Sequence, residues 1–488
     1  MLASALSRLT ARPWLAALGL TVLFAALCIQ GLTRQPLWND EAFSFFVAWR
    51  DVAHTLHMMR QDTQPPAYYL ALTAWLQLGH GVAVLRGLSL VAMVLSVPLL
   101  FDTARRLLGA KVALLAVLLF VLGPESVAWA QKARPYPLQT FCVAVAFWGF
   151  VRVWLSAPPR PWIGWAAYVL GGSLAVLTQY PAVFFLLACN LAMAVRLAKS
   201  WPTERRLAGA WVLAQLALAL LWLPWLPDAV PQVFFHLTPG QIAAKHTLFL
   251  VDRGWLLGTL SGLLAIPYLW RAEPPFLALY AAIAAVGVVA LWRARGRELP
   301  ILAAVVVPLA VCVLAWALLH PVFGYVIYTF VWLRLPYAML IAAGIAAIRP
   351  RWLAAGALAL LLLGNLWGLA NYKATPTPPL DLVAALIGAD LRPGDGVLLS
   401  TTQATRWGLA YYLGPPYAGR LDGLDVADMP AEGWPILTPE QASRVPRLWV
   451  VLPAGETLPF PPADLAPTLL PARLQRVSTV LVERYDRQ

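Results

Sequence analysis

The chain has 488 residues, of which 60% are hydrophobic and only 12% are charged. Soluble chains carry about 25% charged residues, so this composition excludes a soluble globular protein and predicts a polytopic membrane protein. The formal net charge is +13, and the excess of positive charge lies in the first 371 residues, between apolar runs, while residues 372–488 are slightly acidic. This distribution favours membrane topology over nucleic-acid binding as the cause of the positive charge.

Eleven apolar runs are long enough, with their flanks, to cross a bilayer as helices of about 20 residues. They are residues 12–32, 82–101, 111–129, 136–155, 162–178, 181–198, 207–226, 275–292, 300–319, 335–348 and 351–370. The Lys and Arg clusters between them all fall on one side, which the positive-inside rule makes the cytoplasm. The N-terminus is then cytoplasmic and the C-terminus external. The apolar run 254–270 would break this alternation, so we assign it to a long external loop, residues 227–274.

The first external segment, residues 33–70, carries two adjacent carboxylates, Asp40 and Glu41, after Trp38. Apolar residues then recur at helical spacing, with charged residues and histidines between them, which predicts an amphipathic helix in the membrane interface. A carboxylate pair so near a membrane is costly unless it is used, so we expect one of the two to act as a general base. The alternatives are structural: a linker helix that covers the membrane surface, or Asn39 or Asp40 as the cap of that helix.

Arginines beside the external ends of the predicted spans are candidates for binding a phosphate. Arg134, in the motif ARPY, could bind one through two parallel hydrogen bonds. Its alternative role is to extend to the membrane surface as an interfacial residue, and Arg86 has the same ambiguity. Arg334 is flanked by apolar residues, which makes a purely interfacial role harder to accept.

The long external loop adds three cations, Lys245, His246 and Arg253, which could close over an anionic ligand. A solvated loop face is the equally open alternative. His54 and His57 are three residues apart, a spacing that can bind metal, but no third ligand accompanies them. A divalent metal is therefore open but not indicated, and no cofactor is predicted.

The composition changes after residue 371. The sequence TPTPP at 375–379 predicts a stiff linker that ends the last helix. Helical and strand patterns then alternate, which predicts a small α/β domain. The predicted helices are 382–391 and 403–413, and the predicted strands are 396–401, 447–452 and 477–485. We therefore predict a transmembrane domain over residues 1–371 and an external domain over residues 372–488.

Several motifs together resemble the C-type glycosyltransferases (GT-C). The match comprises an apolar N-terminal span, PLWNDEAFS, QPPAYYL, an arginine that opens the second span, KARPY and LAVLTQYPA. Within that superfamily the chain is similar to the bacterial protein O-mannosyltransferases and lipid A aminoarabinose transferases, best over residues 10–200. The resemblance implies an integral enzyme of the bacterial inner membrane. It would transfer a sugar from a polyprenyl-phosphate donor to a lipid, glycan or protein acceptor on the external face, with inversion.

The resemblance also implies residue roles. Asp40 would be the base and Glu41 a supporting residue. The donor phosphate would be bound by cations: Arg134, Arg334, Lys245, His246, Arg253 and Arg86. The substrate cavity would be lined by motif residues: Trp38, Pro65, Pro66, Tyr68, Tyr69, Glu125, Tyr136, Gln179 and Tyr180. Gln179 stands where several relatives have lysine, so one phosphate contact would be missing here or supplied elsewhere.

Two other classes of protein are compatible with a polytopic chain. A transporter or flippase of a lipid-linked molecule would commonly show internal repeats and charges near the bilayer midplane, whereas here the charges lie at one face. A receptor or assembly scaffold would use the C-terminal domain to bind a partner. Sugar transfer that depends on Asp40 would separate the enzyme from both.

Overall fold

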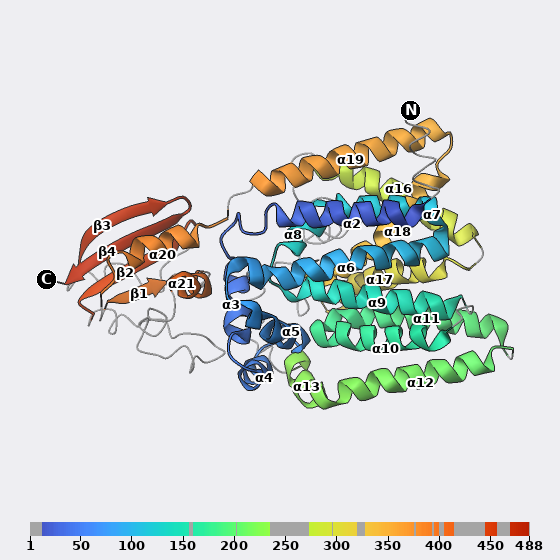
Figure 1. Cartoon of the computed structure of the whole chain (residues 1–488), viewed down its shortest axis with the longest axis horizontal. Helices are drawn as coiled ribbons and strands as arrows, with labels where there is room; N and C mark the ends of the chain where they lie inside the picture. Colours follow the sequence, from blue (N-terminus) through green and yellow to red (C-terminus); the bar gives the residue numbers. More distant parts are fainter. Residues whose placement is uncertain are drawn as a thin grey trace. The chain divides into compact units, whose positions relative to one another are not determined.

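A computed structural model describes residues 12–155, 160–201, 203–234, 273–294, 296–319, 327–374, 377–392, 395–399, 405–413, 445–455 and 469–487. These residues are mainly helical, with one four-stranded sheet near the C-terminus (Figure 1). The predicted fold class, a polytopic helical protein with a small C-terminal α/β part, is confirmed. The chain divides into two compact units, which we call the helical unit and the mixed unit. The helical unit comprises Met1–Gly31, Thr63–Leu72 and Arg86–Ala374, and the mixed unit comprises Leu32–Asp62, Thr73–Leu85 and Thr375–Gln488.

A helix lies over each of the eleven predicted spans. The elements wholly or partly in the helical unit are α2 (Pro13–Ile29), α5 (Ala67–Trp75), α6 (Val82–Leu108), α7 (Ala110–Val121), α8 (Pro124–Ala130), α9 (Pro135–Trp154), α10 (Pro161–Thr178), η2 (Tyr180–Ala182), α11 (Val183–Ser200), α12 (Arg205–Trp222), η3 (Leu223–Trp225), α13 (Leu226–Phe234), α16 (Glu273–Arg293), α17 (Leu299–Leu319), η5 (Ile327–Leu333), α18 (Arg334–Ala347) and α19 (Arg351–Ala374). Among the described residues, eight helices are long and apolar enough to cross a membrane, or nine if α7 and α8, bent by 61°, form one span. The number of crossings stays a prediction.

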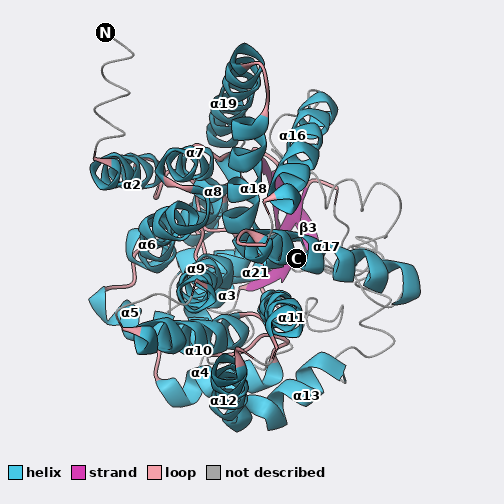
Figure 2. Cartoon of the chain, turned by 90° about the vertical axis from the view of Figure 1, so that its right-hand side faces the viewer, coloured by secondary structure: helices cyan, strands magenta, loops and turns pink. Residues whose placement is uncertain are grey.

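Helices α9 and α18 form the interior of the helical unit. Over its most apolar stretch α18 is 83% buried and α9 is 72% buried, whereas α12 is only 17% buried. Figure 2, viewed roughly along the helices, shows α12, α16 and α19 at the rim of the bundle. The exposed leucines of α12 therefore fit contact with lipid, while α9 and α18 are enclosed by protein on most sides.

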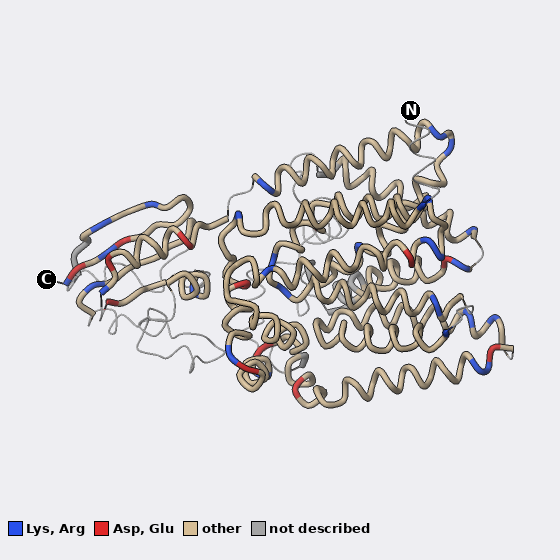
Figure 3. Tube along the Cα trace, viewed as in Figure 1, with Lys and Arg blue, Asp and Glu red and all other residues tan. Residues whose placement is uncertain are grey.

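Basic residues gather at one end of the helical bundle (Figure 3). They stand where α6, α9, α11 and α16 end and where α7, α10, α12 and α19 begin, as expected for helices that alternate in direction. Two carboxylates at this end are paired: Asp102 accepts from Arg105 and Arg106, and Glu204 accepts from Arg196. Those hydrogen bonds from Arg196 lower the pKa of Glu204 below its usual value. The assignment of this end to the cytoplasm stays a prediction.

The mixed unit combines two segments from the start of the chain with its C-terminal part. Its elements are α3 (Asn39–Ala48), α4 (Val52–Gln61), η1 (Leu76–Leu78), α20 (Leu380–Gly388), β1 (Gly396–Leu399), α21 (Arg406–Leu413), β2 (Arg447–Pro453), β3 (Leu469–Val477) and β4 (Val480–Arg487). The strand order is β1-β2-β4-β3, with β1 and β2 parallel and the other pairs antiparallel. A single apolar core joins Ala42 and Phe46 of α3 to Trp407 of α21 and Trp449 of β2.

Two local expectations were wrong. The single interfacial helix is two helices, α3 and α4, because the Asp51 side chain accepts from the His54 backbone N–H at 2.8 Å and starts a new helix. Strand β3 was not predicted. It contains Pro471, where its pairing register with β4 shifts, and it lies at an edge of the sheet, where a proline is tolerated.

Candidate active site

The helical unit places an arginine at the N-terminus of each of its two interior helices. Arg134 is the N-cap residue of α9 and is 5% exposed, and Arg334 is the first residue of α18. The helix dipole disfavours a cation at this position and favours an anion. Two guanidinium groups at two helix N-termini therefore make this part of the unit strongly electropositive, as a phosphate site requires.

A chain of contacts joins the two arginines, although 200 positions separate them in sequence. The Nη2 of Arg334 lies 3.7 Å from Oε2 of Glu125, and the indole N–H of Trp129 donates to the same oxygen at 2.7 Å. The rings of Trp129 and Tyr136 pack edge to face, with 5.0 Å between centroids. Nη2 of Arg134 lies 3.5 Å from the Tyr136 hydroxyl. We call these five residues the arginine cluster.

Local sequence explains how the arginine cluster is assembled. Glu125 and Trp129 are four residues apart on α8, so they lie on one face of that short helix. Pro135 fills the first turn of α9 and fixes the chain just after Arg134. Val331 of η5 packs against Trp129 and Tyr136, and this contact sets the position from which α18 begins.

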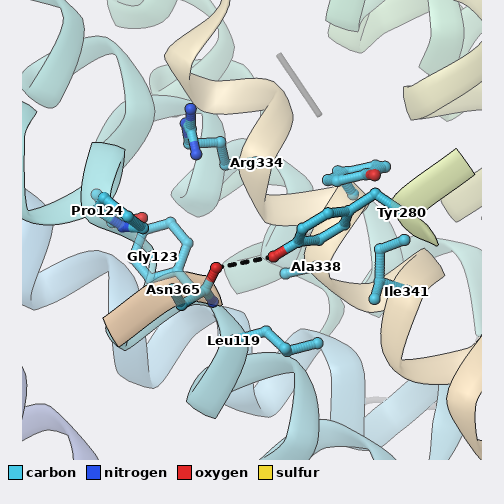
Figure 4. Close-up of a pocket in the computed structure, with 11 residues that line it drawn as sticks. Leu119, Gly123, Pro124, Tyr280, Arg334, Ala338, Ile341 and Asn365 are labelled. Carbon is cyan, nitrogen blue, oxygen red and sulfur yellow. Dashed lines mark hydrogen bonds between the residues drawn. The ribbon is translucent and has the colours of Figure 1, made fainter. Parts of the chain in front are cut away.

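A small cavity of about 40 Å³, with both polar and apolar side chains in its wall, lies beside Arg334 (Figure 4). The Tyr280 hydroxyl donates to Oδ1 of Asn365 at 2.9 Å in its wall, and the buried Tyr337 hydroxyl in the same wall has no hydrogen-bond partner among the described residues. A cavity of this size exceeds the ~10–15 Å³ that one water needs. It is far smaller than the ~300 Å³ of a ligand pocket. The cavity therefore suits water that solvates the inner side of Arg334, not a sugar.

A second polar group, which we call the amide cluster, surrounds the proline pair. Gln179 donates from Nε2 to Oε1 of Gln64 at 2.7 Å, and the Tyr69 hydroxyl donates to the same oxygen at 3.3 Å. Gln139 donates to the backbone carbonyl of Gln179 at 3.4 Å. Pro65, Pro66 and Tyr68 are buried beside it. Gln179 thus takes part in a neutral hydrogen-bonded group, which offers amides and a hydroxyl instead of a cation.

An apolar cleft of about 340 Å³ lies between α10, α11 and α12. Its wall includes Tyr180 and Trp222, and the Tyr180 hydroxyl is held by Gln232 and by the indole N–H of Trp225. Its remaining walls are the aliphatic and small residues Ser173, Val176, Val183, Leu186, Leu218 and Ala219. A hydrocarbon chain is the ligand that matches such a lining.

The acidic pair belongs to the mixed unit. Trp38, 39% exposed, is the N-cap residue of α3, and its backbone N–H donates to Oε2 of Glu41 at 3.1 Å. Glu41 is 1% exposed and caps the helix, whereas Asp40 is half-buried in the first turn. The alternative role of Asn39 or Asp40 as the cap of this helix was wrong, because Trp38 is the N-cap residue and the Asn39 side chain accepts from the Trp407 backbone N–H at 2.8 Å. Asp40 is therefore the more accessible carboxylate of the two.

The other predicted cations sort into two groups. Arg86 is buried in α6, one turn before Ser89, whose hydroxyl lies 3.5 Å from the backbone carbonyl of Arg134. Lys245, His246 and Arg253 lie outside the described residues, as does the apolar run 254–270. Within the described ranges, no three His, Cys, Asp or Glu side chains lie close enough to share a metal ion.

Several residues of these groups were not predicted. Trp129 follows Glu125 at helical spacing, and that spacing could have indicated it. Gln64 directly precedes the proline pair and is the first residue of the QPPAYYL motif, so that motif could have indicated it. Tyr280 and Asn365 are polar residues inside apolar spans, which is a signal of a polar interior site, but their partners are set only by the packing of α16 against α19.

Residues 63–226 match a family model described as dolichyl-phosphate-mannose-protein mannosyltransferase. No curated protein sequence matches the chain. Among solved structures, ArnT from Cupriavidus metallidurans in the apo state is 14% identical with a TM-score of 0.61, over 96% of this chain and 98% of that chain. The same protein bound to undecaprenyl phosphate gives 13% identity and a TM-score of 0.60, over 97% and 98% of the two chains.

The oligosaccharyltransferase of Archaeoglobus fulgidus, in a structure tethered with an acceptor peptide, is 13% identical with a TM-score of 0.56. That match covers 91% of this chain and 70% of that chain. Together these matches establish the fold of the C-type glycosyltransferases for this chain and confirm the resemblance seen in its motifs.

Proposed function

We propose that the protein is an integral-membrane glycosyltransferase that takes a hexose or pentose from a polyprenyl-phosphate donor. The observation that carries this proposal is the arginine cluster, in which Arg134 and Arg334, at the N-termini of α9 and α18, are linked through Glu125, Trp129 and Tyr136. The fold shared with ArnT, which has been solved with undecaprenyl phosphate bound, supports the same class of donor. The match to a mannosyltransferase family model supports sugar transfer.

The reaction would be a single displacement at the anomeric carbon. Asp40 takes the proton from an acceptor hydroxyl, the acceptor oxygen bonds to the anomeric carbon, and the bond from that carbon to the phosphate oxygen breaks. The leaving polyprenyl phosphate carries the negative charge, which Arg134 and Arg334 neutralise. Attack from the face opposite the phosphate inverts the anomeric centre. Glu41 supports the reaction by fixing the first turn of α3.

Two other groups match parts of such a donor. The amide cluster of Gln64, Gln179 and Tyr69 offers neutral partners for sugar hydroxyls. The apolar cleft between α10, α11 and α12 has room for about 340 Å³ of hydrocarbon, and Tyr180 is in its wall. The acceptor is a lipid, a glycan or a protein on the external face. The protein would reside in the bacterial inner membrane, with residues 1–371 forming the transmembrane domain and residues 372–488 an external domain.

The test is reconstitution of the full chain in liposomes with synthetic polyprenyl-phosphate hexoses and pentoses, followed by detection of released polyprenyl phosphate and of the glycosylated acceptor. In the same assay, Asp40→Asn should lower turnover by about 10²-fold or more, as for a lost general base. Glu41→Gln should reduce turnover less, because an amide oxygen can still accept from the Trp38 backbone N–H.

Asp51→Asn is the matched control, since it neutralises a carboxylate of the same unit whose visible role is to cap α4. It should keep most of the activity. Full turnover by a folded Asp40→Asn protein would remove Asp40 from the mechanism. Movement of the lipid across the bilayer without sugar transfer would favour the flippase reading instead.

A further inference from the structure

Glu125 is the unexpected member of the arginine cluster, because a carboxylate repels the phosphate that the arginines are proposed to bind. It is 8% exposed, and its Oε2 atom is shared by Trp129 at 2.7 Å and Arg334 at 3.7 Å. The two distances differ in kind: the first is a full hydrogen bond, while the second is an ion pair beyond hydrogen-bond length. Trp129 therefore fixes the carboxylate, and Arg334 is only loosely paired with it.

The position of Glu125 is stabilised without Arg334. It lies in the first turn of α8, where the helix dipole favours a negative charge, and Pro124 begins that helix. The helix dipole disfavours the charge of Arg334, because Arg334 is a cation at the N-terminus of α18. Glu125 thus provides a fixed negative charge that balances Arg334 when no phosphate is bound.

We propose that Glu125 is a positioning residue that competes with the donor phosphate for Arg334 and so limits how tightly the spent polyprenyl phosphate is held. The inference rests on the proposed function, since it requires a phosphate at Arg334. Its consequence is kinetic: the enzyme gives up some affinity for its anionic product, and that product leaves faster. Trp129 weakens the competition, because its hydrogen bond holds the Glu125 carboxylate 3.7 Å from the Arg334 guanidinium instead of in direct contact.

The experiment measures binding of undecaprenyl phosphate to the full chain in nanodiscs, beside donor KM and kcat. Glu125→Gln removes the competing charge, so it should tighten binding by about tenfold, which is about 1.4 kcal/mol. The donor KM and kcat should both fall, because product release becomes slower. Trp129→Phe should act in the opposite direction, with binding about threefold weaker, because the released carboxylate can then approach Arg334.

Two matched controls are available at other places in the same unit. Asp228→Asn, on α13, removes one negative charge away from the arginine cluster and should leave binding unchanged. Trp148→Phe removes an indole N–H from Asp102 at the opposite end of the bundle, which is the same kind of pair as Trp129 and Glu125. It should also leave undecaprenyl phosphate binding unchanged.

The outcomes separate the inference from the proposed function. If Arg334→Ala leaves undecaprenyl phosphate binding unchanged, the phosphate site itself is misassigned and the proposed function loses its main support. If Arg334→Ala weakens binding but Glu125→Gln weakens it too, or leaves it unchanged, only the competition is overturned. Opposite shifts for Glu125→Gln and Trp129→Phe are the result that supports it, and a general loss of structure could not produce them.

Discussion

The proposed role of Arg334 depends on its position at the start of a buried helix. The sequence marks it as a cation among apolar residues, which is costly inside a membrane without a partner. The structure adds that it stands at the N-terminus of the most buried helix and beside Glu125. Arg134 likewise stands at the N-terminus of a buried helix, α9, which makes the pair more specific than either residue alone.

Replacing these arginines should weaken donor use in a graded way. Arg334→Ala and Arg134→Ala should each raise the donor KM by about 10-fold to 100-fold, since a hydrogen bond to a charged group is worth about 1.5–3 kcal/mol. Lysine should restore activity only partly, because an ammonium lacks the planar two-pronged geometry. Donor KM in liposomes is the measurement. Arg293→Ala, an exposed arginine at the basic end of the bundle, is the control that should keep wild-type kinetics.

Individual residues were predictable from sequence to different degrees. Asp40, Glu41, Arg134 and Arg334 could each be selected, because charged residues beside apolar runs are few. That Arg134 and Arg334 meet through Glu125, Trp129 and Tyr136 could not be predicted, since the meeting depends on how η5 packs against α9. The capping role of Glu41 was likewise missed, because the helix begins at Asn39 with Trp38 as its N-cap residue, whereas Asn39 or Asp40 was considered as the cap.

At the scale of elements, a close approach to α16 fixes the C-terminal half of α18. A methyl group at Gly344 would lie 2.3 Å from the Ile283 carbonyl oxygen, and one at Gly287 would lie 2.5 Å from the Leu340 carbonyl oxygen. The two helix backbones thus meet through small residues, as membrane helices commonly do. The membrane helices were predictable from apolar length, but this contact was not, because a glycine in a span reveals nothing about its neighbour.

Substitution at this contact should therefore be destabilising. Gly344→Ala should cost about 1–3 kcal/mol of unfolding free energy by overpacking, and the thermal unfolding midpoint in detergent should fall. Gly356→Ala on α19 is the control, since no atom lies within 4 Å of the added methyl group. It should be neutral or slightly stabilising, because alanine is the better helix former. Equal midpoints for the two variants would show that α16 and α18 can separate without cost.

For the whole molecule, the gathering of basic residues at one end of the bundle predicts orientation. With a cytoplasmic N-terminus and eleven crossings, the turn between β3 and β4 is external and the basic end is cytoplasmic. Thr479→Cys, in that turn, should react with a membrane-impermeant maleimide in intact cells. Lys199→Cys, at the basic end of α11, should react only after permeabilisation. The reverse labelling of Thr479→Cys would mean that residues 254–270 cross the membrane.

The mixed unit has a consequence for biosynthesis. Helix α3 leaves the ribosome more than 350 residues before α21, the helix on which it packs. Pairing of segments so far apart is slow and must wait for the intervening helices to insert. The helix that carries Asp40 therefore gains this packing only after α21 has been made. A chain that terminates before Leu413 lacks part or all of α21, so its mixed unit is incomplete. Helix α3, which carries Asp40, then loses the helix on which it packs, so premature termination also removes the support of the acidic site.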